Sequence, residues 1–293
     1  MKRRAFLTTA SGVISSALAA PTPSKKSSPI YLSLKDGMIG GKGSLEEKYQ
    51  LMKDLGYDGV EFSVPGRSDI EQAIAASKKV KLPIHGGVNM RHWNIKMSSP
   101  NEEERTKAVE AMKNSLKEVN QVGGTSVLLV PGVAGGKVTQ KEAWDRSIVE
   151  IKKCLPLASK LGMHILIENV WNGMFYDPKG SNTQSADRLK NYLDEIGSPW
   201  VGSYFDIGNH QRFGKPAEWI KTLGRRIVKL DVKDWGIKNG FSKIGEGDVD
   251  WPAVRKSLDE IGYSGWATAE VGGGNKERLA EVLKNMRTHL LGQ

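Results

Sequence analysis

Leu55-Gly56-Tyr57-Asp58-Gly59 is the stretch that indicates the fold, because the phrase recurs near the end of the chain as Ile261-Gly262-Tyr263-Ser264-Gly265. In both copies an amphipathic segment ends at a glycine and an aromatic residue, and a second glycine then leads into a short apolar run. A glycine just after a helix, followed by a β-prone run, is typical of a helix-to-strand connection. The phrase therefore predicts the same kind of βα unit near both ends of the 293-residue chain.

Between and around these copies, short apolar runs alternate with longer amphipathic segments, which is the pattern of a parallel sheet with crossover helices. The expected strands cover residues 30–34, 59–63, 82–86, 126–130, 164–169, 202–207, 227–232 and 266–271. Eight units in series favour an α/β fold with a closed (β/α)₈ TIM barrel over an open doubly wound sheet, whose G-x-G-x-x-G fingerprint does not follow the first strand. We expect a single TIM-barrel catalytic domain over residues 29–293.

The expected helices carry recognisable end signals. Ser44 and Glu47 form a capping-box pattern at the start of one helix, and Gly56 ends it. Two helical stretches, 101–122 and 139–161, are longer than is usual in a barrel. They either brace the barrel wall or carry an interface between copies of the chain, so a homo-oligomer stays an alternative to a monomer.

The first 28 residues are predicted to be an export signal and linker. Arg3 and Arg4 precede Phe6-Leu7, a mildly apolar stretch with small residues at 17–19, and then a Pro/Ser/Lys segment. This resembles a twin-arginine signal and predicts a periplasmic or secreted protein that meets the membrane only through the export machinery. The apolar stretch is too short and too polar to span a bilayer core of about 30 Å.

The composition limits the classes of partner. The formal net charge is +10, but five of the basic residues lie within the first 26 positions, and no basic run with interleaved aromatic residues follows. A nucleic-acid partner is therefore not expected. Cys154 is the only cysteine, which excludes an intrachain disulfide, and its apolar surroundings predict a buried thiol.

Four consecutive expected strands each end near a carboxylate: Glu168, Asp206, Asp231 and Glu270. In a TIM barrel the chemistry lies at the carboxyl ends of the strands, so these four side chains are expected at one rim. Clustered like charges in a low-dielectric site repel unless a cation lies among them or some are protonated. One divalent metal ion explains the set, and its oxygen ligands favour Mn²⁺ or Mg²⁺, with Co²⁺ and Zn²⁺ as alternatives.

The same phrases carry a family resemblance. Ile167-Glu168-Asn169, residues 205–209, Val232-Lys233-Asp234 and Ala269-Glu270 resemble the barrel motifs of the xylose-isomerase-like sugar isomerases and epimerases, in strand order. The resemblance implies that Glu168, Asp206, the position of Asp231 and Glu270 bind one divalent ion. Asp231 departs from the family pattern, which has a histidine there, and adds a negative charge. We expect Lys229 or Lys233, which share strand parity with Asp231, to neutralise it.

The constellation predicts proton abstraction next to a carbonyl, through an enediolate, on a free sugar or sugar derivative. Glu168 and Glu270 are the catalytic candidates, one removing the proton and the other returning it. The same first step also serves a lyase that cleaves 3-keto-glycosides by elimination, and a non-catalytic sugar-binding barrel is a further alternative. The glycines at 272–274 fit either a phosphate cradle or a loop that allows close backbone approach to any polar ligand.

Further polar and aromatic residues near the expected strand ends are candidates for sugar binding. Aromatic faces stack on sugar rings, while histidine, amide, carboxylate and ammonium groups hydrogen-bond hydroxyls. The candidates are Glu61, His85, His92, Trp93, Trp171, Asn209, His210 and Lys233.

Overall fold

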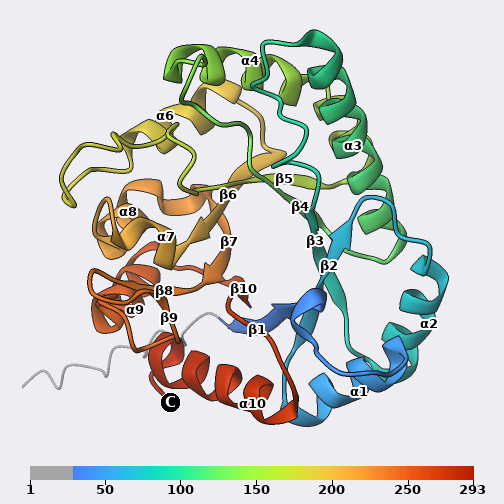
Figure 1. Ribbon diagram of the computed structural model, residues 1–293. Coiled ribbons are helices and arrows are strands. Elements are labelled where there is room, and N and C mark those ends of the chain that lie inside the picture. The colour runs from blue at the N-terminus through green and yellow to red at the C-terminus, as the bar shows by residue number, and fades with distance from the viewer. Residues whose placement is uncertain (1–28) are drawn as a thin grey trace, which may run out of the picture.

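The computed structural model describes residues 29–293, so the predicted export signal and linker lie outside the described residues. Eight parallel strands close into a barrel in the order β1-β2-β3-β4-β5-β6-β7-β10, with β10 pairing back onto β1 (Figure 1). The barrel strands are β1 (Ile30–Lys35), β2 (Gly59–Val64), β3 (Ile84–Asn89), β4 (Ser126–Leu129), β5 (His164–Glu168), β6 (Val201–Asp206), β7 (Ile227–Val232) and β10 (Gly265–Ala269). The predicted (β/α)₈ TIM barrel is confirmed.

Helices surround the strands on the outside of the ring (Figure 1). The α-helices are α1 (Leu45–Leu55), α2 (Ile70–Val80), α3 (Glu102–Gln121), α4 (Gln140–Lys152), α5 (Leu155–Leu161), α6 (Asp187–Ile196), α7 (Ile207–Gln211), α8 (Pro216–Leu223), α9 (Trp251–Ile261) and α10 (Lys276–Asn285). Three short helical turns, η1 (Asp36–Met38), η2 (Gly224–Arg226) and η3 (Met286–Leu291), complete the set. Among the helices within residues 29–293, none combines the length and apolar character needed to cross a bilayer.

The local signals explain where the helices begin and end. Ser44 and Glu47 form the expected capping box of α1, and Gly56 ends that helix in the left-handed conformation with φ of 95°. Gly262, in the second copy of the phrase, ends α9 in the same way with φ of 66°. Both glycines are needed because an L side chain is strained at these φ values.

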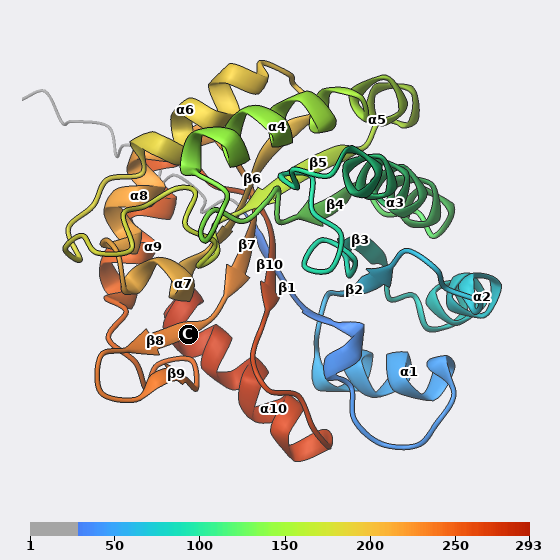
Figure 2. The same ribbon diagram turned by 45° about the horizontal axis from the view of Figure 1, so that its top comes forward.

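Two local predictions were wrong, and one element was not predicted. The third strand begins at Ile84 rather than residue 82, because the Leu82 N–H bonds to the Ser77 carbonyl and closes the turn after α2. The stretch 139–161 forms two helices, α4 and α5, because Pro156 lacks the N–H that would continue the first. An antiparallel hairpin, β8 (Asp234–Gly236) and β9 (Gly240–Ser242), follows β7 beside α7 and was not predicted (Figure 2).

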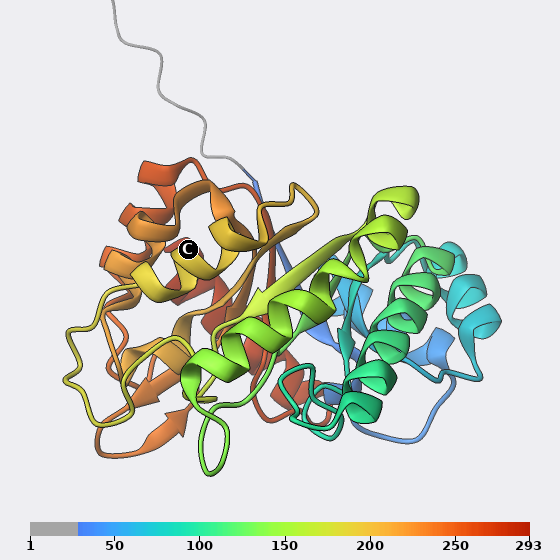
Figure 3. The same ribbon diagram turned by 90° about the horizontal axis from the view of Figure 1, so that it is seen from above.

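Apolar side chains fill the space between strands and helices and part of the barrel interior. Val88, Leu128, Leu166 and Tyr204 pack together as a small cluster, while a much larger apolar cluster joins the strands to the helices. Viewed from the side, the hairpin and the long loops after β3 and β4 lie at the end of the barrel opposite the start of β1 (Figure 3). That end carries the carboxyl termini of the strands and holds the site described next.

Candidate active site

The four strand-end carboxylates lie together. Glu168 and Asp206 are the last residues of β5 and β6, Asp231 is the last but one of β7, and Glu270 follows β10. Each offers one carboxylate oxygen, and these oxygens all lie within 4.8 Å of one another. The closed barrel produces this convergence, since β5, β6, β7 and β10 are consecutive neighbours in the ring.

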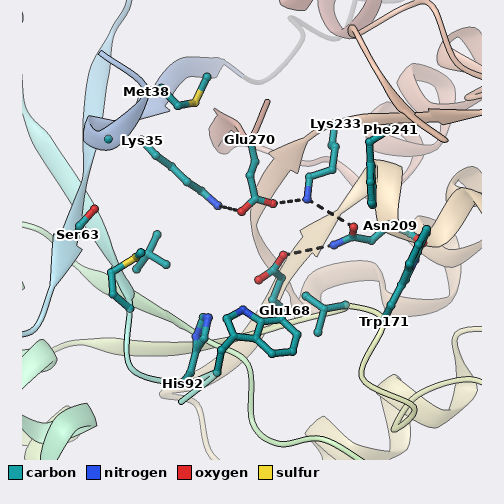
Figure 4. A pocket seen from close by; sticks show the side chains of 15 residues that line it. Lys35, Met38, Ser63, His92, Glu168, Trp171, Asn209, Lys233, Phe241 and Glu270 are labelled. Atoms are coloured by element: carbon teal, nitrogen blue, oxygen red, sulfur yellow. Dashed lines mark hydrogen bonds and ion pairs between the residues drawn. The ribbon is translucent and has the colours of Figure 1, made fainter. Parts of the chain in front are cut away.

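Two lysines lie among the carboxylates. Lys35, the last residue of β1, places its Nζ 3.0 Å from Asp231 Oδ2 and 2.5 Å from Glu270 Oε1. Lys233, just after β7, places its Nζ 3.1 Å from Asp206 Oδ2. The same Nζ lies 2.5 Å from Glu270 Oε2 (Figure 4). Lys35 is therefore the lysine that forms an ion pair with Asp231. Lys229 is instead hydrogen-bonded to His85 at 2.7 Å. The expectation that Lys229 or Lys233 would pair with Asp231 is corrected accordingly.

The lysines make the two glutamates unlike each other. Burial raises the pKa of Glu168, and the nearby charge of Glu270 raises it further, so this carboxyl group holds a proton well above its usual range. Burial acts in the same direction on Glu270, but Lys35 and Lys233 outweigh it and hold the pKa of Glu270 below its ordinary value. Glu168 is thus the more readily protonated of the two glutamates.

The carboxylates fit a divalent cation. Asp231 is fully buried, and its Oδ1 accepts no hydrogen bond from any described residue. A buried carboxylate oxygen without a donor is costly unless a cation completes its environment. If all six charged side chains are ionised, four carboxylates and two ammonium groups leave a charge of minus two, which one divalent ion neutralises. The all-oxygen donor set suits a hard ion.

A cavity of about 480 Å³ opens above the carboxylates. Its wall combines ionisable groups with aromatic and apolar side chains, several of which Figure 4 labels. Predicted binding residues on this wall are His92, Trp93, Trp171, Asn209 and Lys233. The size and the mixture of apolar walls with a few converging polar groups are typical of a small-molecule site.

Two of these residues are held in place by backbone groups. His92 Nδ1 accepts a hydrogen bond from the Val130 N–H at 3.1 Å, and burial lowers the pKa of His92 to about 3. The ring is therefore neutral, and with Nδ1 as acceptor its Nε2 carries the proton. Trp171 donates its indole N–H to the Asn209 carbonyl at 2.7 Å and stacks on Phe241 with ring centroids 5.0 Å apart.

Asn209 links the carboxylates to α7. Its backbone N–H donates to Asp206 Oδ1 at 2.7 Å, which makes Asp206 the N-cap of this one-turn helix. Its side-chain amide reaches Glu168 Oε1 at 3.4 Å and the Asn169 carbonyl at 3.1 Å. Asn209 therefore fixes the relative positions of Asp206 and Glu168.

Glu61 and His85 lie away from the cavity wall, in a buried ring of hydrogen bonds inside the barrel. The ring runs from Lys229 through His85 Nδ1 (2.7 Å), His85 Nε2 to Ser33 (2.8 Å), Ser33 to Thr268 (2.9 Å), Thr268 to Tyr204 (2.8 Å) and Tyr204 to Glu61 (3.0 Å). Each group can donate to the next, and Lys229 closes the ring 4.0 Å from Glu61. Both residues lie deeper than expected, because β2 and β3 continue for three and four residues beyond them.

His210 also lies outside the cavity wall. Its ring is fully buried, is hydrogen-bonded to the Asn169 side chain and packs on Trp219. It follows Asp206 in sequence, but α7 turns it toward α8 rather than toward the cavity. The geometry gives His210 a packing position.

Several wall residues escaped the sequence reasoning, among them Lys35, Met38 and Phe241. Lys35 ends a barrel strand, so the rule that selected the carboxylates would also have selected it. Met38 follows in η1, whose 3₁₀ turn had no clear signal. Phe241 lies on the unpredicted hairpin, which has no alternation long enough to be read as strands.

Comparisons with known proteins agree with this architecture. A family model described as xylose isomerase-like TIM barrel matches residues 49–289. An uncharacterized protein of Methanocaldococcus jannaschii is 27% identical over 201 residues, which cover 66% of this chain and 64% of that protein. L-ribulose-5-phosphate 3-epimerase UlaE of Escherichia coli is 26% identical over 234 residues, which cover 75% of this chain and 79% of the epimerase.

Solved structures share the fold at lower sequence identity. The IolI protein with a bound zinc atom has a TM-score of 0.75 at 15% identity and covers 89% of this chain and 98% of its own. The 3-keto-D-glucoside 4-epimerase of E. coli has a TM-score of 0.71 at 16% identity, with 89% of this chain and all of that chain covered. With the closed barrel, the clustered strand-end carboxylates and the family match over most of its length, this chain belongs to the xylose isomerase-like TIM barrel family.

Proposed function

We propose that this protein is a divalent-metal-dependent isomerase or epimerase that moves a proton next to the carbonyl of a free sugar or sugar derivative. One observation carries the proposal: oxygens of Glu168, Asp206, Asp231 and Glu270 converge within 4.8 Å beneath an aromatic-walled cavity. Such an arrangement provides a hard-cation site and a proton carrier at one place.

The relatives support the reaction class. UlaE is named as a sugar-phosphate 3-epimerase, and the E. coli structural neighbour is described as an epimerase of a 3-keto-glucoside. The IolI structure is described with a zinc atom. These activities and the zinc atom are those of the relatives. The carboxylate cluster of this chain is compatible with the same chemistry, and this favours an epimerase or isomerase.

The four carboxylates would hold the ion, with Mn²⁺ or Mg²⁺ favoured and Co²⁺ or Zn²⁺ as alternatives. When bound, such an ion supplies Lewis-acid chemistry that makes a C–H bond beside a carbonyl more acidic. The remaining chemistry belongs to the side chains. Glu168 belongs to the cluster and lies on the cavity wall, so we assign to it the uptake and release of the substrate proton. Glu270 stays ionised between Lys35 and Lys233 and fixes both ammonium groups.

The cavity wall positions the sugar. The Nε2–H of His92 is free to donate to a hydroxyl, since the other ring nitrogen is held by Val130. Trp93 is 46% exposed on the cavity wall and offers its face to an apolar sugar face. A neutral donor and an exposed indole suit an uncharged sugar.

The structural neighbour described as a 3-keto-D-glucoside 4-epimerase favours a second candidate, a lyase acting on 3-keto-glycosides. A simple inversion needs two opposed proton carriers, one ionised and one protonated, and Glu168 and Glu270 could supply both. A single effective base suffices for an aldose-ketose shift or for removal of a proton followed by loss of a β-glycosidic oxygen. The first proton transfer, to Glu168, is common to all of these reactions.

Deuterium incorporation tests the proposal. Metal-loaded protein in D₂O is incubated with free ketoses and with 3-keto-glycosides, and the recovered sugars are examined by mass spectrometry and NMR. We expect exchange at the carbon beside the carbonyl, with an epimer or isomer in the first case and release of the second unit if the lyase reaction occurs. Glu168→Gln should reduce exchange by about a hundredfold or more.

The control is Glu110→Gln, which makes the same change on the surface of α3 and should exchange like the wild type. Absence of exchange with every divalent ion and sugar would refute the enzymatic proposal and leave the non-catalytic sugar-binding alternative. Metal analysis of the purified protein separates these cases, since a binding barrel without a functional cluster would retain no ion.

We also propose that the protein is exported by the twin-arginine route and acts in the periplasm or outside the cell. The Arg3-Arg4 pair and the apolar stretch that follows support this proposal. Full-length protein carrying Arg3→Lys and Arg4→Lys should remain in the cytoplasm, while the unaltered chain is exported. Equal distribution of the two would contradict the proposal.

A further inference from the structure

A second cavity, of about 630 Å³, adjoins the first at the carboxyl end of the barrel. The two share three wall residues, Lys233, Phe241 and Glu270. Either volume falls in the range of about 300–1,000 Å³ that is usual for a small-molecule site. Because Glu270 and Lys233 line both cavities, a ligand longer than one sugar ring can reach from the carboxylate cluster into the second cavity.

The hairpin β8–β9 forms much of the wall of the second cavity. Phe241, on β9, stacks on Trp171 of the first cavity, and Lys233 Nζ lies 5.0 Å from the centre of the Phe241 ring. Asp234 anchors the hairpin by accepting hydrogen bonds from the Gly245 N–H at 2.8 Å and the Trp251 indole N–H at 3.0 Å. The shared boundary is therefore held in place by packing on one side and hydrogen bonds on the other.

The chemistry of the second cavity favours a neutral, hydroxyl-rich ligand. Its three cations are all paired with carboxylates: Lys243 and Arg278 with Glu281, at 2.5 and 2.7 Å, and Lys233 with Glu270 at 2.5 Å. The wall also carries the Asn239 amide and the Glu246 carboxylate, which has no ion pair with a described residue. Paired cations next to a carboxylate disfavour a phosphate, whereas amide and carboxylate groups hydrogen-bond hydroxyls well.

The glycines at 272–274, beside this cavity, also fit a site for a neutral ligand better than a phosphate cradle. Gly274 exchanges backbone hydrogen bonds with Met38 and Gly40, and a Cβ at Gly273 would lie 2.1 Å from the Met38 carbonyl oxygen. Close backbone approach therefore accounts for Gly273, whereas a Cβ at Gly274 would lie 3.1 Å from the Arg278 side chain. Gly272 differs, because a Cβ there would meet no atom within 4 Å. Gly272 lines the second cavity, and the space beside its Cα is open to that cavity.

We propose that the second cavity binds the second sugar ring of a disaccharide-like glycoside whose reacting keto sugar occupies the first cavity. The inference rests on the proposed function for the identity of the reacting ring. It assigns the glycosidic linkage to the boundary formed by Lys233, Phe241 and Glu270. The substrate class is thus a neutral keto-glycoside with a hydroxylated second unit.

Two glycine substitutions test this assignment. Gly272→Phe fills the second cavity, and Gly37→Phe fills the first; a Cβ at either position meets no atom within 4 Å, and neither backbone is left-handed. Calorimetry measures binding of the unreactive sugars cellobiose, trehalose and glucose to metal-loaded protein. Exchange in D₂O is measured with the 3-keto forms of the same sugars.

We expect the wild type to bind at least one disaccharide at least tenfold more tightly than glucose. Gly272→Phe should remove that difference, while its affinity for glucose changes less than twofold. Gly37→Phe should weaken all three sugars. Equal affinity of the wild type for glucose and both disaccharides, or an unchanged disaccharide advantage in Gly272→Phe, overturns the inference. Binding that follows the expected pattern without deuterium exchange would refute the proposed reaction but retain the second-ring site.

Discussion

Lys35 Nζ lies 3.0 Å from Asp231 Oδ2, and the pair joins the first strand of the barrel to the seventh. Between them in the ring lies β10, which carries Glu270 just beyond its end, and Lys35 contacts this carboxylate too. Burial would lower the pKa of Lys35, but Asp231 and Glu270 outweigh it and keep the ammonium group charged. At the position where the family resemblance led us to expect a histidine, this chain thus has an aspartate paired with a lysine.

Removing that base should make the site depend more strongly on metal. Lys35→Met keeps the length of the side chain but leaves the fully buried Asp231 without its ammonium partner. Losing one member of a buried ion pair costs about 3–5 kcal/mol, so the metal-free variant should unfold at a lower denaturant concentration. The extra negative charge should in turn tighten binding of Mn²⁺. Chemical denaturation with EDTA and with Mn²⁺ measures both effects.

The matched comparison is Lys35→Met combined with Asp231→His, which removes the base and the acid together. This double variant should recover most of the metal-free stability lost in Lys35→Met, because no unpaired carboxylate then remains at position 231. If the two changes were additive in stability and metal affinity, Lys35 and Asp231 would act independently and their pairing would have no energetic role.

His92 should make the protein sensitive to moderately acidic pH. The pKa of His92 is about 3 in the folded chain against an ordinary value of 6.5, so the unfolded chain binds a proton first as the pH falls. The stability that the neutral His92 contributes to the folded state is therefore lost as the pH falls below 6.5. The free energy of unfolding decreases by about 1.4 kcal/mol for each pH unit, or by about 2 kcal/mol at pH 5. His92→Gln retains an acceptor for the Val130 N–H without a titrating group. Between pH 7.5 and 5, the free energy of unfolding of this variant should fall by about 2 kcal/mol less than that of the wild type, as measured by urea unfolding.

The hydrogen-bonded ring inside the barrel should matter for stability rather than for chemistry. Tyr204→Phe removes the hydroxyl that lies 3.0 Å from Glu61 and 2.8 Å from Thr268. A buried carboxylate and a buried hydroxyl then each lose a partner, at a cost of about 1–3 kcal/mol. Because none of these side chains lines the cavity, KM and kcat should change less than about twofold. A large loss of kcat with unchanged stability would instead assign the ring a part in catalysis.

The sequence predicts the barrel well because its signals are local and repeated. The two copies of the glycine-aromatic phrase, the capping box at Ser44 and the alternation of apolar runs each act over a few residues. The register of β3 was missed because Leu82 is as apolar as a strand residue, and only its hydrogen bond to Ser77 shows that it belongs to a turn. Periodicity does not distinguish a buried turn residue from the first residue of a strand.

The candidate site could be predicted in part. The strand-end rule found the carboxylates because each is preceded by an apolar strand of its own. It misplaced His85 because the strand end itself was assigned three residues too early. Lys35 also ends a strand, so the same rule applies to it. Its pairing with Asp231 and Glu270 was not predictable, because these partners are 196 and 235 residues away and only closure of β1 onto β10 brings them together. Such contacts depend on the register of the closed sheet, which the sequence pattern leaves open.

Trp93 should contribute to sugar binding without supporting the fold. The indole is 46% exposed on the cavity wall, so Trp93→Ala removes an apolar face that a bound sugar would cover while little packing is lost. Losing about 1–2 kcal/mol of contact corresponds to a five- to thirtyfold weaker substrate affinity. Trp144→Ala is the control, because this indole packs on Tyr192 and donates to Glu195 outside the cavity. That variant should lose stability and keep its KM, and titrations followed by calorimetry distinguish the two. Equal KM values for Trp93→Ala and the wild type would show that the sugar lies elsewhere on the wall, toward Trp171 and Phe241.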